Sequence, residues 1–123
     1  MAKKNSSSKR TLELYRNMGY ECQVVERWNP HAFKRQDLFG FIDILALCPH
    51  RGIVGLQVTT QGEVPAHIAK ILAEPRSQKW LNAGGMLHLV EWKKPGKKNR
   101  QWMFRVYPWP VNPNNELPEW RIK

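Results

Sequence analysis

The stretch that decides the fold is Gly40-Phe-Ile-Asp43-Ile-Leu-Ala-Leu-Cys-Pro-His-Arg-Gly52-Ile-Val-Gly-Leu-Gln57-Val-Thr59-Thr60. It contains two apolar runs, 40–47 and 53–59, which the turn-forming residues at 48–52 separate. Short apolar runs bounded by turn residues are typical of buried strands. We therefore predict a hairpin over 40–59 at the centre of the fold.

Asp43 is a carboxylate inside the first of these strands, where it costs free energy unless it is paired, exposed or bound to a cation. Successive residues of a strand point to opposite faces, so the two runs divide into two sets. One face is wholly apolar and consists of Ile42, Ile44, Ala46, Val54, Leu56 and Val58. The opposite face then brings Asp43 together with Gln57 and Thr59.

The rest of the chain divides into further predicted elements on either side of this hairpin. They are a helix from Ser8 to Gly19, a strand over 21–28, a polar loop over 31–39, a helical stretch over 65–83 interrupted at Pro75, a strand over 86–92, a basic turn over 93–100 and a strand over 102–107. The order is helix, three strands, helix and two strands. We expect an α/β fold with a central sheet flanked by helices.

A chain of 123 residues has room for a single domain. We assign residues 1–8 to a flexible basic arm, 9–108 to the domain and 109–123 to a tail rich in Pro and Trp that we expect to be irregular. The chain has no apolar run long enough to span a membrane, and no signal peptide is expected. The two cysteines, Cys22 and Cys48, lack zinc-ligand spacing and indicate a reducing compartment.

Charge is the first indication of a partner, because 20 Lys and Arg face 10 Asp and Glu, which gives a net charge of +10. Such a balance favours a polyanion, and above all nucleic acid, although a merely basic protein is the alternative. The basic residues form two clusters. They are Lys3, Lys4, Lys9 and Arg10 in the first, and Lys93, Lys94, Lys97, Lys98, Arg100 and Arg105 in the second.

The polar face around Asp43 suits a hard cation such as Mg²⁺, which prefers oxygen ligands. Asp43 would supply charge, while Gln57 and the peptide group of Val58 would each supply a carbonyl oxygen. Glu13 could add a second carboxylate if the first helix packs against the strands, and Asp37 is a further candidate. The alternatives are that Asp43 pairs with an Arg or Lys and that Glu13 and Thr59 are an ordinary helix and strand residue.

The run from Arg35 to Leu47, Arg-Gln-Asp-Leu-Phe-Gly-Phe-Ile-Asp-Ile-Leu-Ala-Leu, followed by Gly55-Leu-Gln-Val-Thr-Thr60, resembles the PD-(D/E)XK nuclease superfamily. It is similar to small phage nucleases and to Holliday-junction resolvase-like proteins. The resemblance covers about residues 9–92. It implies a restriction-endonuclease-like core in the order helix-strand-strand-strand-helix-strand, here with an extra C-terminal strand and a mixed central sheet.

The resemblance also implies roles for individual residues. Glu13 matches the acidic residue of the first helix and Asp43 the Asp of the second strand. Gln57 stands where the superfamily usually has Glu or Asp, and Thr59 where it usually has Lys. The triplet Gln57-Val58-Thr59 is nevertheless one that phage-type members often carry.

Since Thr59 cannot supply the charge of the usual lysine, another cation has to do so. Lys70, on the following helix, is the candidate, and His67 on the same helix is a candidate for proton transfer. The catalytic set expected from the resemblance is thus Glu13, Asp43, Gln57, Thr59 and Lys70.

The expected DNA contacts are less specific. Lys34 and Arg35 lie close in sequence to the site and could bind the scissile phosphate. The predicted hairpin tip carries Lys93, Lys94, Lys97, Lys98 and Arg100, which could bind the backbone of a duplex. Trp92 and Trp102 flank that tip and are expected to pack across strands, with base stacking as the alternative. Trp109 and Trp120 are expected to hold the tail on the domain or to contact a partner.

These observations together predict a Mg²⁺-dependent or Mn²⁺-dependent DNA endonuclease acting on duplex or branched DNA. The resemblance implies a phage or mobile-element origin, a cytoplasmic location in a bacterial or infected host cell, and a homodimer as one option. Two alternatives stay open. The first is a DNA-binding module with a degenerate site, and the second is a small basic adaptor that binds protein through its Trp-rich tail.

Overall fold

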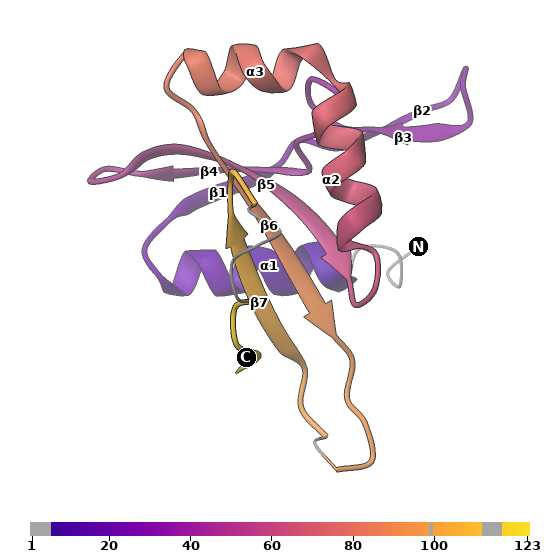
Figure 1. Cartoon of the computed structure of the whole chain (residues 1–123), viewed down its shortest axis with the longest axis vertical. Helices are drawn as coiled ribbons and strands as arrows, with labels where there is room; N and C mark the ends of the chain where they lie inside the picture. Colours follow the sequence, from indigo (N-terminus) through magenta and orange to yellow (C-terminus); the bar gives the residue numbers. More distant parts are fainter. Residues whose placement is uncertain (1–5, 99, 112–116) are drawn as a thin grey trace.

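The computed structural model describes residues 6–98, 100–111 and 117–123, which form a mixed α/β fold (Figure 1). The helices of these residues are α1 (Ser6–Asn17), α2 (Val64–Ala73) and α3 (Pro75–Asn82). The strands are β1 (Glu21–Val24), β2 (Arg27–Asn29), β3 (Lys34–Gln36), β4 (Ile44–Cys48), β5 (Gly52–Thr60), β6 (Met86–Lys93), β7 (Met103–Pro108) and β8 (Arg121–Ile122).

Six strands form one mixed sheet in the order β1-β4-β5-β6-β7-β8. The β5–β6 pair is parallel and the other pairs are antiparallel. A parallel pair needs a crossover connection, and α2 and α3 supply it. The remaining two strands, β2 and β3, form a separate antiparallel ribbon that projects from the body beyond α2 (Figure 1).

Helix α1 covers one face of the sheet. Tyr15 of α1 is buried with Ile44, Val54 and Trp92 from three neighbouring strands. The indole nitrogen of Trp92 donates a hydrogen bond of 2.9 Å to the hydroxyl of Thr11, so these two buried groups are paired. This is the apolar face that alternation along the central hairpin predicts.

Helices α2 and α3 cover the opposite face, together with residues 109–111. Ile71 of α2 is fully buried with Leu87 and Leu89 of β6. The ring of Trp80 lies over Gly85 so closely that a Cβ there would come within 2.3 Å of it. A glycine is therefore required where α3 meets the start of β6.

The central hairpin is confirmed, because β4 and β5 pair in antiparallel register with Ile44 opposite Leu56. Its first strand starts later than predicted, at Ile44, since residues 38–42 form a turn closed by Leu38 N donating to the carbonyl of Ile42 at 2.8 Å. The turn places Ile42 over Gly55, on the face under α2. The assignment of Ile42 to the same face as Ile44 is thus wrong.

The predicted strand over 21–28 and loop over 31–39 are also corrected. β1 ends at Val24, because Val25 N and Glu26 N both turn to the carbonyl oxygen of Asp43, at 2.9 and 3.2 Å. The chain then leaves the sheet and forms the β2–β3 ribbon. The ribbon was missed because its six strand residues are mostly polar and lack the alternation of a half-buried strand.

Other boundaries follow the sequence more closely. The helical stretch is interrupted at Pro75, as predicted, and Glu74 caps α3 by accepting a hydrogen bond from Arg76 N at 3.1 Å. α1 begins at Ser6, so residues 6–8 belong to the helix rather than to the predicted arm, whose residues 1–5 lie outside the described part. In the tail, β8 pairs with β7, so residues 121–122 are not irregular.

No helix in the described ranges is both long and apolar enough to cross a membrane. Cys22 is buried in the core under α1 and Cys48 is half-buried, and both are free thiols.

Candidate metal centre

Asp43 lies at the point where β4 begins and its neighbour β5 continues. Its N–H donates to the carbonyl of Leu56 at 2.9 Å, and its own carbonyl accepts from the N–H groups of Val25 and Glu26, which follow β1. Beyond this point the N–H of Val58 has no β4 partner, and Asp43 Oδ2 accepts from it at 2.8 Å. The carboxylate of Asp43 therefore pairs a backbone N–H of β5 that β4 leaves without a partner. Asp43 is only 5% exposed.

Gln57 is the second buried polar group of the site. Its Nε2 donates to Asp43 Oδ2 at 2.7 Å, and the residue is 1% exposed. Its Oε1 is buried without a hydrogen-bond partner. Because both atoms belong to one amide group, this unpaired oxygen lies beside Asp43. An unpaired buried oxygen costs free energy, which a cation at the same place would recover.

Two further carboxylates join Asp43, one from each end of the β2–β3 ribbon. Glu26 immediately precedes β2 and Asp37 immediately follows β3. One carboxylate oxygen from each of Glu26, Asp37 and Asp43 lies within 4.8 Å of the other two. Three carboxylates and an amide oxygen are the ligand types that Mg²⁺ and Mn²⁺ prefer, so the residues present fit such an ion.

Burial and the neighbouring acids shift the pKa values of these carboxylates. Burial first, and then the hydrogen bond and the charge of Asp37, raise the pKa of Asp43 to about 8, although the hydrogen bond from Val58 acts in the opposite direction. Burial, followed by the charge of Asp37, also raises the pKa of Glu26. For Asp37 burial acts upward, but hydrogen bonds with Asp43 and Lys70 prevail and lower its pKa. A group of acids in which the pKa of one member is raised this far is a candidate for binding a cation.

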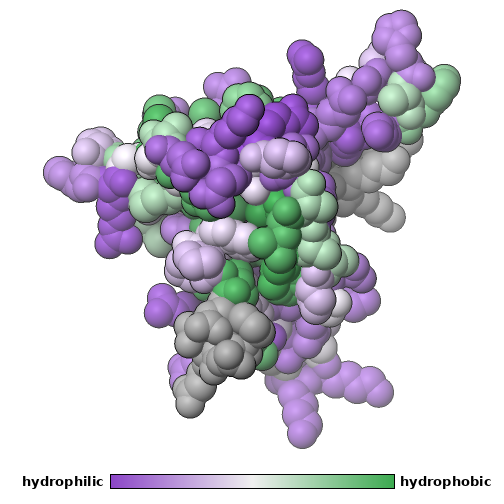
Figure 2. Space-filling view, turned by 45° about the horizontal axis from the view of Figure 1, so that its top comes forward, coloured by the Kyte–Doolittle hydropathy of each residue, from purple (hydrophilic) through white to green (hydrophobic). Residues whose placement is uncertain are grey.

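A hollow of about 360 Å³, which Asp37 helps to line, has a basic rim. Lys70 Nζ lies 2.5 Å from Asp37 Oδ2, and Arg35 Nη1 lies 3.3 Å from Glu26 Oε1. The residues that line it are Lys34, Arg35, Gln36, Asp37, Gly40, Lys70 and Arg76. Hydrophilic side chains dominate the adjoining surface over α3 and the ribbon (Figure 2). The hollow thus has basic side chains at its rim that suit an anionic group, and two of them already pair with acids of the centre.

The structure places the remaining predicted catalytic residues at different distances from this centre. Lys70 reaches it through Asp37, as its place on the helix after β5 led us to expect. His67, one turn earlier, is half-buried with its Nδ1 unpaired, and burial and then Lys70 lower its pKa while Asp37 raises it. Thr59 is buried on the same strand as Gln57, and its hydroxyl lies 3.4 Å from the carbonyl of Thr60.

Glu13 is not brought to the site. It lies on the exposed side of α1, and its Oε2 accepts from Lys123 Nζ at 2.6 Å. The pairing with Lys123 lowers the pKa of Glu13. The expected helix carboxylate is therefore corrected, since the additional acids of the centre come from Glu26 and Asp37.

The basic loop between β6 and β7 projects from the opposite side of the molecule to the ribbon (Figure 1). Lys94, Lys97, Lys98 and Arg100 are exposed there. The flanking Trp92 and Trp102 hold the guanidinium of Arg10, 5.4 and 3.4 Å from their ring centres, and Trp92 also packs on Phe104. Trp92 is thereby buried within the protein, and Arg10 covers a face of the half-buried Trp102.

The predicted role of the tail tryptophans in holding the tail is supported in the same way. The ring centre of Trp120 lies 4.0 Å from the guanidinium of Arg105 and 5.5 Å from Lys93 Nζ. Trp109 packs against the core under α2. Arg105 in turn donates to the buried Glu91 at 2.7 Å, so the tail is tied to the sheet by a paired charge.

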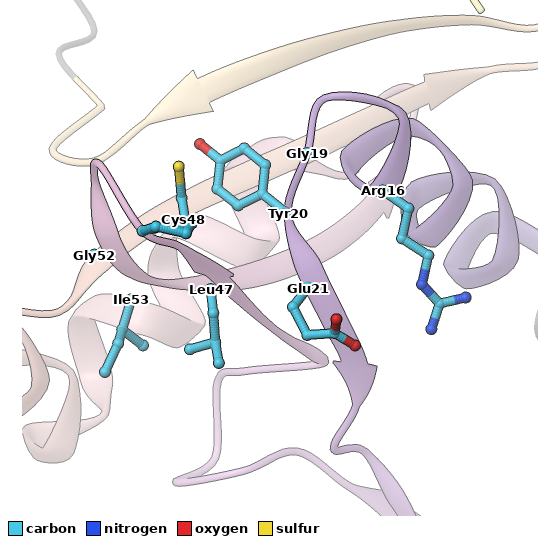
Figure 3. A pocket seen from close by; sticks show the side chains of 9 residues that line it. Arg16, Gly19, Tyr20, Glu21, Leu47, Cys48, Gly52 and Ile53 are labelled. Carbon is cyan, nitrogen blue, oxygen red and sulfur yellow. The ribbon is translucent and has the colours of Figure 1, made fainter.

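A second hollow, of about 580 Å³, lies at the far end of the β4–β5 hairpin (Figure 3). The side chains of Leu47 and Ile53 lie side by side there, as cross-strand partners, and Cys48 lies near the ring of Tyr20. The charged residues among its lining are Arg16 and Glu21. It brings together no group of acids like that at the other end of the hairpin.

The sequence missed Glu26 as a member of the centre. Its signal was present but depended on strand register: β1 pairs with β4 so that Val24 lies opposite Ile44, which puts the end of β1 beside Asp43. Comparison of the chain with protein-family models, with curated proteins and with solved structures finds no match. The chemistry of the centre is therefore argued from its geometry.

Proposed function

We propose that this chain is a Mg²⁺-dependent or Mn²⁺-dependent DNA endonuclease with a restriction-endonuclease-like core. The observation that carries the proposal is the convergence of the carboxylates of Glu26, Asp37 and Asp43. The amide that binds Asp43 carries the unpaired buried oxygen of Gln57, and a hollow with a cationic rim lies beside Asp37. Acids that hold a divalent cation next to cations that bind a phosphate are what phosphodiester hydrolysis requires.

The element order supports the same assignment. The succession α1, β1, β4, β5, α2 and β6 follows the helix-strand-strand-strand-helix-strand order of that core. The β2–β3 ribbon is an insertion between the first two core strands, and β7 and β8 are additions at its end. The charge of +10 supports a nucleic-acid substrate.

The metal would be held by the three carboxylates, by Gln57 Oε1 and by the carbonyl of Val58, whose N–H already turns toward Asp43. When bound, a divalent ion lowers the pKa of a coordinated water and offsets the charge that develops on the phosphate. Lys70 and Arg35 would orient the phosphate in the hollow, since both side chains already lie against the acids. Gln57 would position Asp43 through its amide hydrogen bond.

This arrangement accounts for the two departures from the usual superfamily triplet. Gln57 adds no charge, but Glu26 and Asp37 supply two further carboxylates. Thr59 cannot act as a cation, but Lys70 reaches the same centre from α2. Both compensations rest on residues of this chain, so we expect the site to be active.

The test is cleavage of branched, duplex and single-stranded DNA with Mg²⁺ or Mn²⁺, comparing the wild type with Asp43→Asn. Because Asn keeps the acceptor oxygen for Gln57 and Val58, we expect folding to be retained while cleavage falls by about 100-fold or more. Glu21→Gln, which neutralises an exposed acid at the other end of the sheet, is the matched control and should cut like the wild type.

The DNA-binding module without catalysis is the second candidate, and the neutral residues at 57 and 59 favour it. Wild-type protein that binds DNA in a salt-sensitive way but cuts nothing with either metal would establish it. Protein that neither cuts nor binds DNA would leave the adaptor, although Trp120 and Trp109 are already engaged within the fold.

A further inference from the structure

The β2–β3 ribbon carries two large aromatic side chains that nothing in the fold buries. Phe33 is 80% exposed and Trp28 is 53% exposed. Phe33 also adopts a φ of 51°, a left-handed backbone conformation that a bulky residue rarely takes. A glycine would relieve that strain, so the phenylalanine is not there to stabilise the turn.

The turn that presents Phe33 is well defined. Asn29 Oδ1 accepts from the N–H of His31 at 2.9 Å and from that of Ala32 at 3.2 Å. These two bonds fix the turn at the end of the ribbon and leave the ring of Phe33 facing outward. The projecting ribbon (Figure 1) therefore ends in a turn that exposes the ring of Phe33.

The charge of the ribbon identifies the kind of partner. Residues 27–36 contain Arg27, Lys34 and Arg35 and no acidic residue. Trp28 lies opposite Arg35 in the register, so an aromatic ring and a guanidinium share one face. Aromatic rings interleaved with cations are the combination that binds nucleic acid, the rings against bases and the cations against phosphates.

At its base, the ribbon is joined to the candidate metal centre through the residues before β2 and after β3. Glu26 precedes β2 and Asp37 follows β3, and Arg35 pairs with Glu26 across the base of the ribbon. Phe33 precedes Asp37 by four residues, which in an extended strand spans roughly 13 Å. That length corresponds to about four stacked nucleotides, so the tip can reach a base near the scissile phosphate.

We propose that the ribbon is a base-stacking element that selects DNA with an unpaired base close to the cut, with Phe33 and Trp28 stacking on bases and Lys34 and Arg35 binding the adjoining phosphates. An unpaired base offers its face without the cost of unstacking a duplex, which favours it over a fully paired site. This inference rests on the proposed function for the position of the cut, but the binding preference is independent of catalysis.

The experiment measures the affinity of the full chain, in EDTA so that DNA stays intact, for two fluorescent duplexes of equal length. One contains a single unpaired 2-aminopurine and the other has it paired. We expect the wild type to prefer the first and to quench its 2-aminopurine by stacking. Phe33→Ala and Phe33→Gly should each weaken binding of the first duplex by roughly tenfold or more while changing the second by less than about twofold. Phe33→Tyr should retain the preference.

Phe39→Ala is the matched control, because Phe39 is a 44% exposed aromatic residue with a φ of 54° outside the ribbon, and both affinities should stay at wild-type values. Equal affinity of the wild type for the two duplexes, or a Phe33→Ala variant that keeps the preference, would overturn the proposal. Selective binding by a protein that cuts no DNA would refute the nuclease and leave the ribbon standing. Cutting without any preference would do the reverse.

Discussion

The two ends of the β4–β5 hairpin make opposite use of the same pair of strands. At the turn end, Leu47 and Ile53 pair across the strands and line the larger hollow (Figure 3). At the other end, β4 begins one residue after Asp43 while β5 continues, and an aspartate, a glutamine and two further acids fill the gap. Most of the residues that line the smaller hollow beside them are charged.

This contrast shows that the buried acids gather where a strand loses its neighbour, and not beside the larger cavity. Where β4 is paired, its backbone groups are satisfied and the side chains are free to be apolar. Where β5 loses that neighbour, Val58 N needs another acceptor, and a buried carboxylate supplies it. The unpaired strand edge therefore explains why a costly charge is placed there, and why the acids gather around it.

The largest effect is expected from the pH dependence of stability at the polar end. The pKa of Asp43 is raised to about 8, so between about pH 4 and pH 8 the folded state binds more protons than the unfolded state. The free energy of unfolding of the metal-free protein should thus fall as pH rises through this window. Asp43→Asn should lose that dependence and be more stable than the wild type at pH 8 by several kcal/mol, because stability falls by about 1.4 kcal/mol per pH unit across this window.

Urea unfolding in EDTA at a series of pH values measures this difference. Adding Mg²⁺ at pH 8 should restore stability to the wild type, because a ligand of the folded state stabilises it, and should leave Asp43→Asn unchanged. If the free energy of unfolding depended on pH equally in the two metal-free proteins, Asp43 would not be the group with the raised pKa. Glu21→Gln should follow the wild type throughout.

A smaller loss is expected from Lys70→Met, which removes a cation from the rim of the hollow but no ligand. Cleavage should fall by about 100-fold, mainly in kcat, because a cation that offsets charge on the phosphate acts in the transition state. The change in the free energy of unfolding should stay within about 1 kcal/mol, since Lys70 is 45% exposed. Lys79→Met on α3 is the control, and an equal loss in both variants would remove Lys70 from the site.

The smallest effect is expected at the apolar end. Leu47→Ser and Ile53→Thr exchange side chains that are 42% and 46% exposed, so each should change the free energy of unfolding by about 0.5 kcal/mol or less. The cleavage rate of each variant should stay within about twofold of the wild-type rate. A large loss of cleavage from either variant would mean that the larger hollow takes part in the reaction, and would reverse the comparison.

Much of the fold could be predicted because it rests on local patterns. The hairpin followed from two apolar runs around a turn, and the break between α2 and α3 from Pro75, whose ring is suited to the first turn of a helix. The placement of Asp43 and Gln57 on one face followed from alternation along two adjacent strands, and the structure adds the hydrogen bond between them. The face of Ile42 could not be predicted, because the turn at 38–42 shifts the phase of the alternation and a shift of one residue reverses the face.

From the sequence alone we could predict the central hairpin, an acid on its polar face and the basic character of the chain. Which acids surround Asp43 depends on the tertiary structure. Glu13 was favoured because it lies on a helix, but α1 turns it toward Lys123, whereas Glu26 and Asp37 converge through the register of β1 with β4 and the return of the ribbon. Such convergence depends on pairing between strands distant in sequence, which no local pattern of residues specifies.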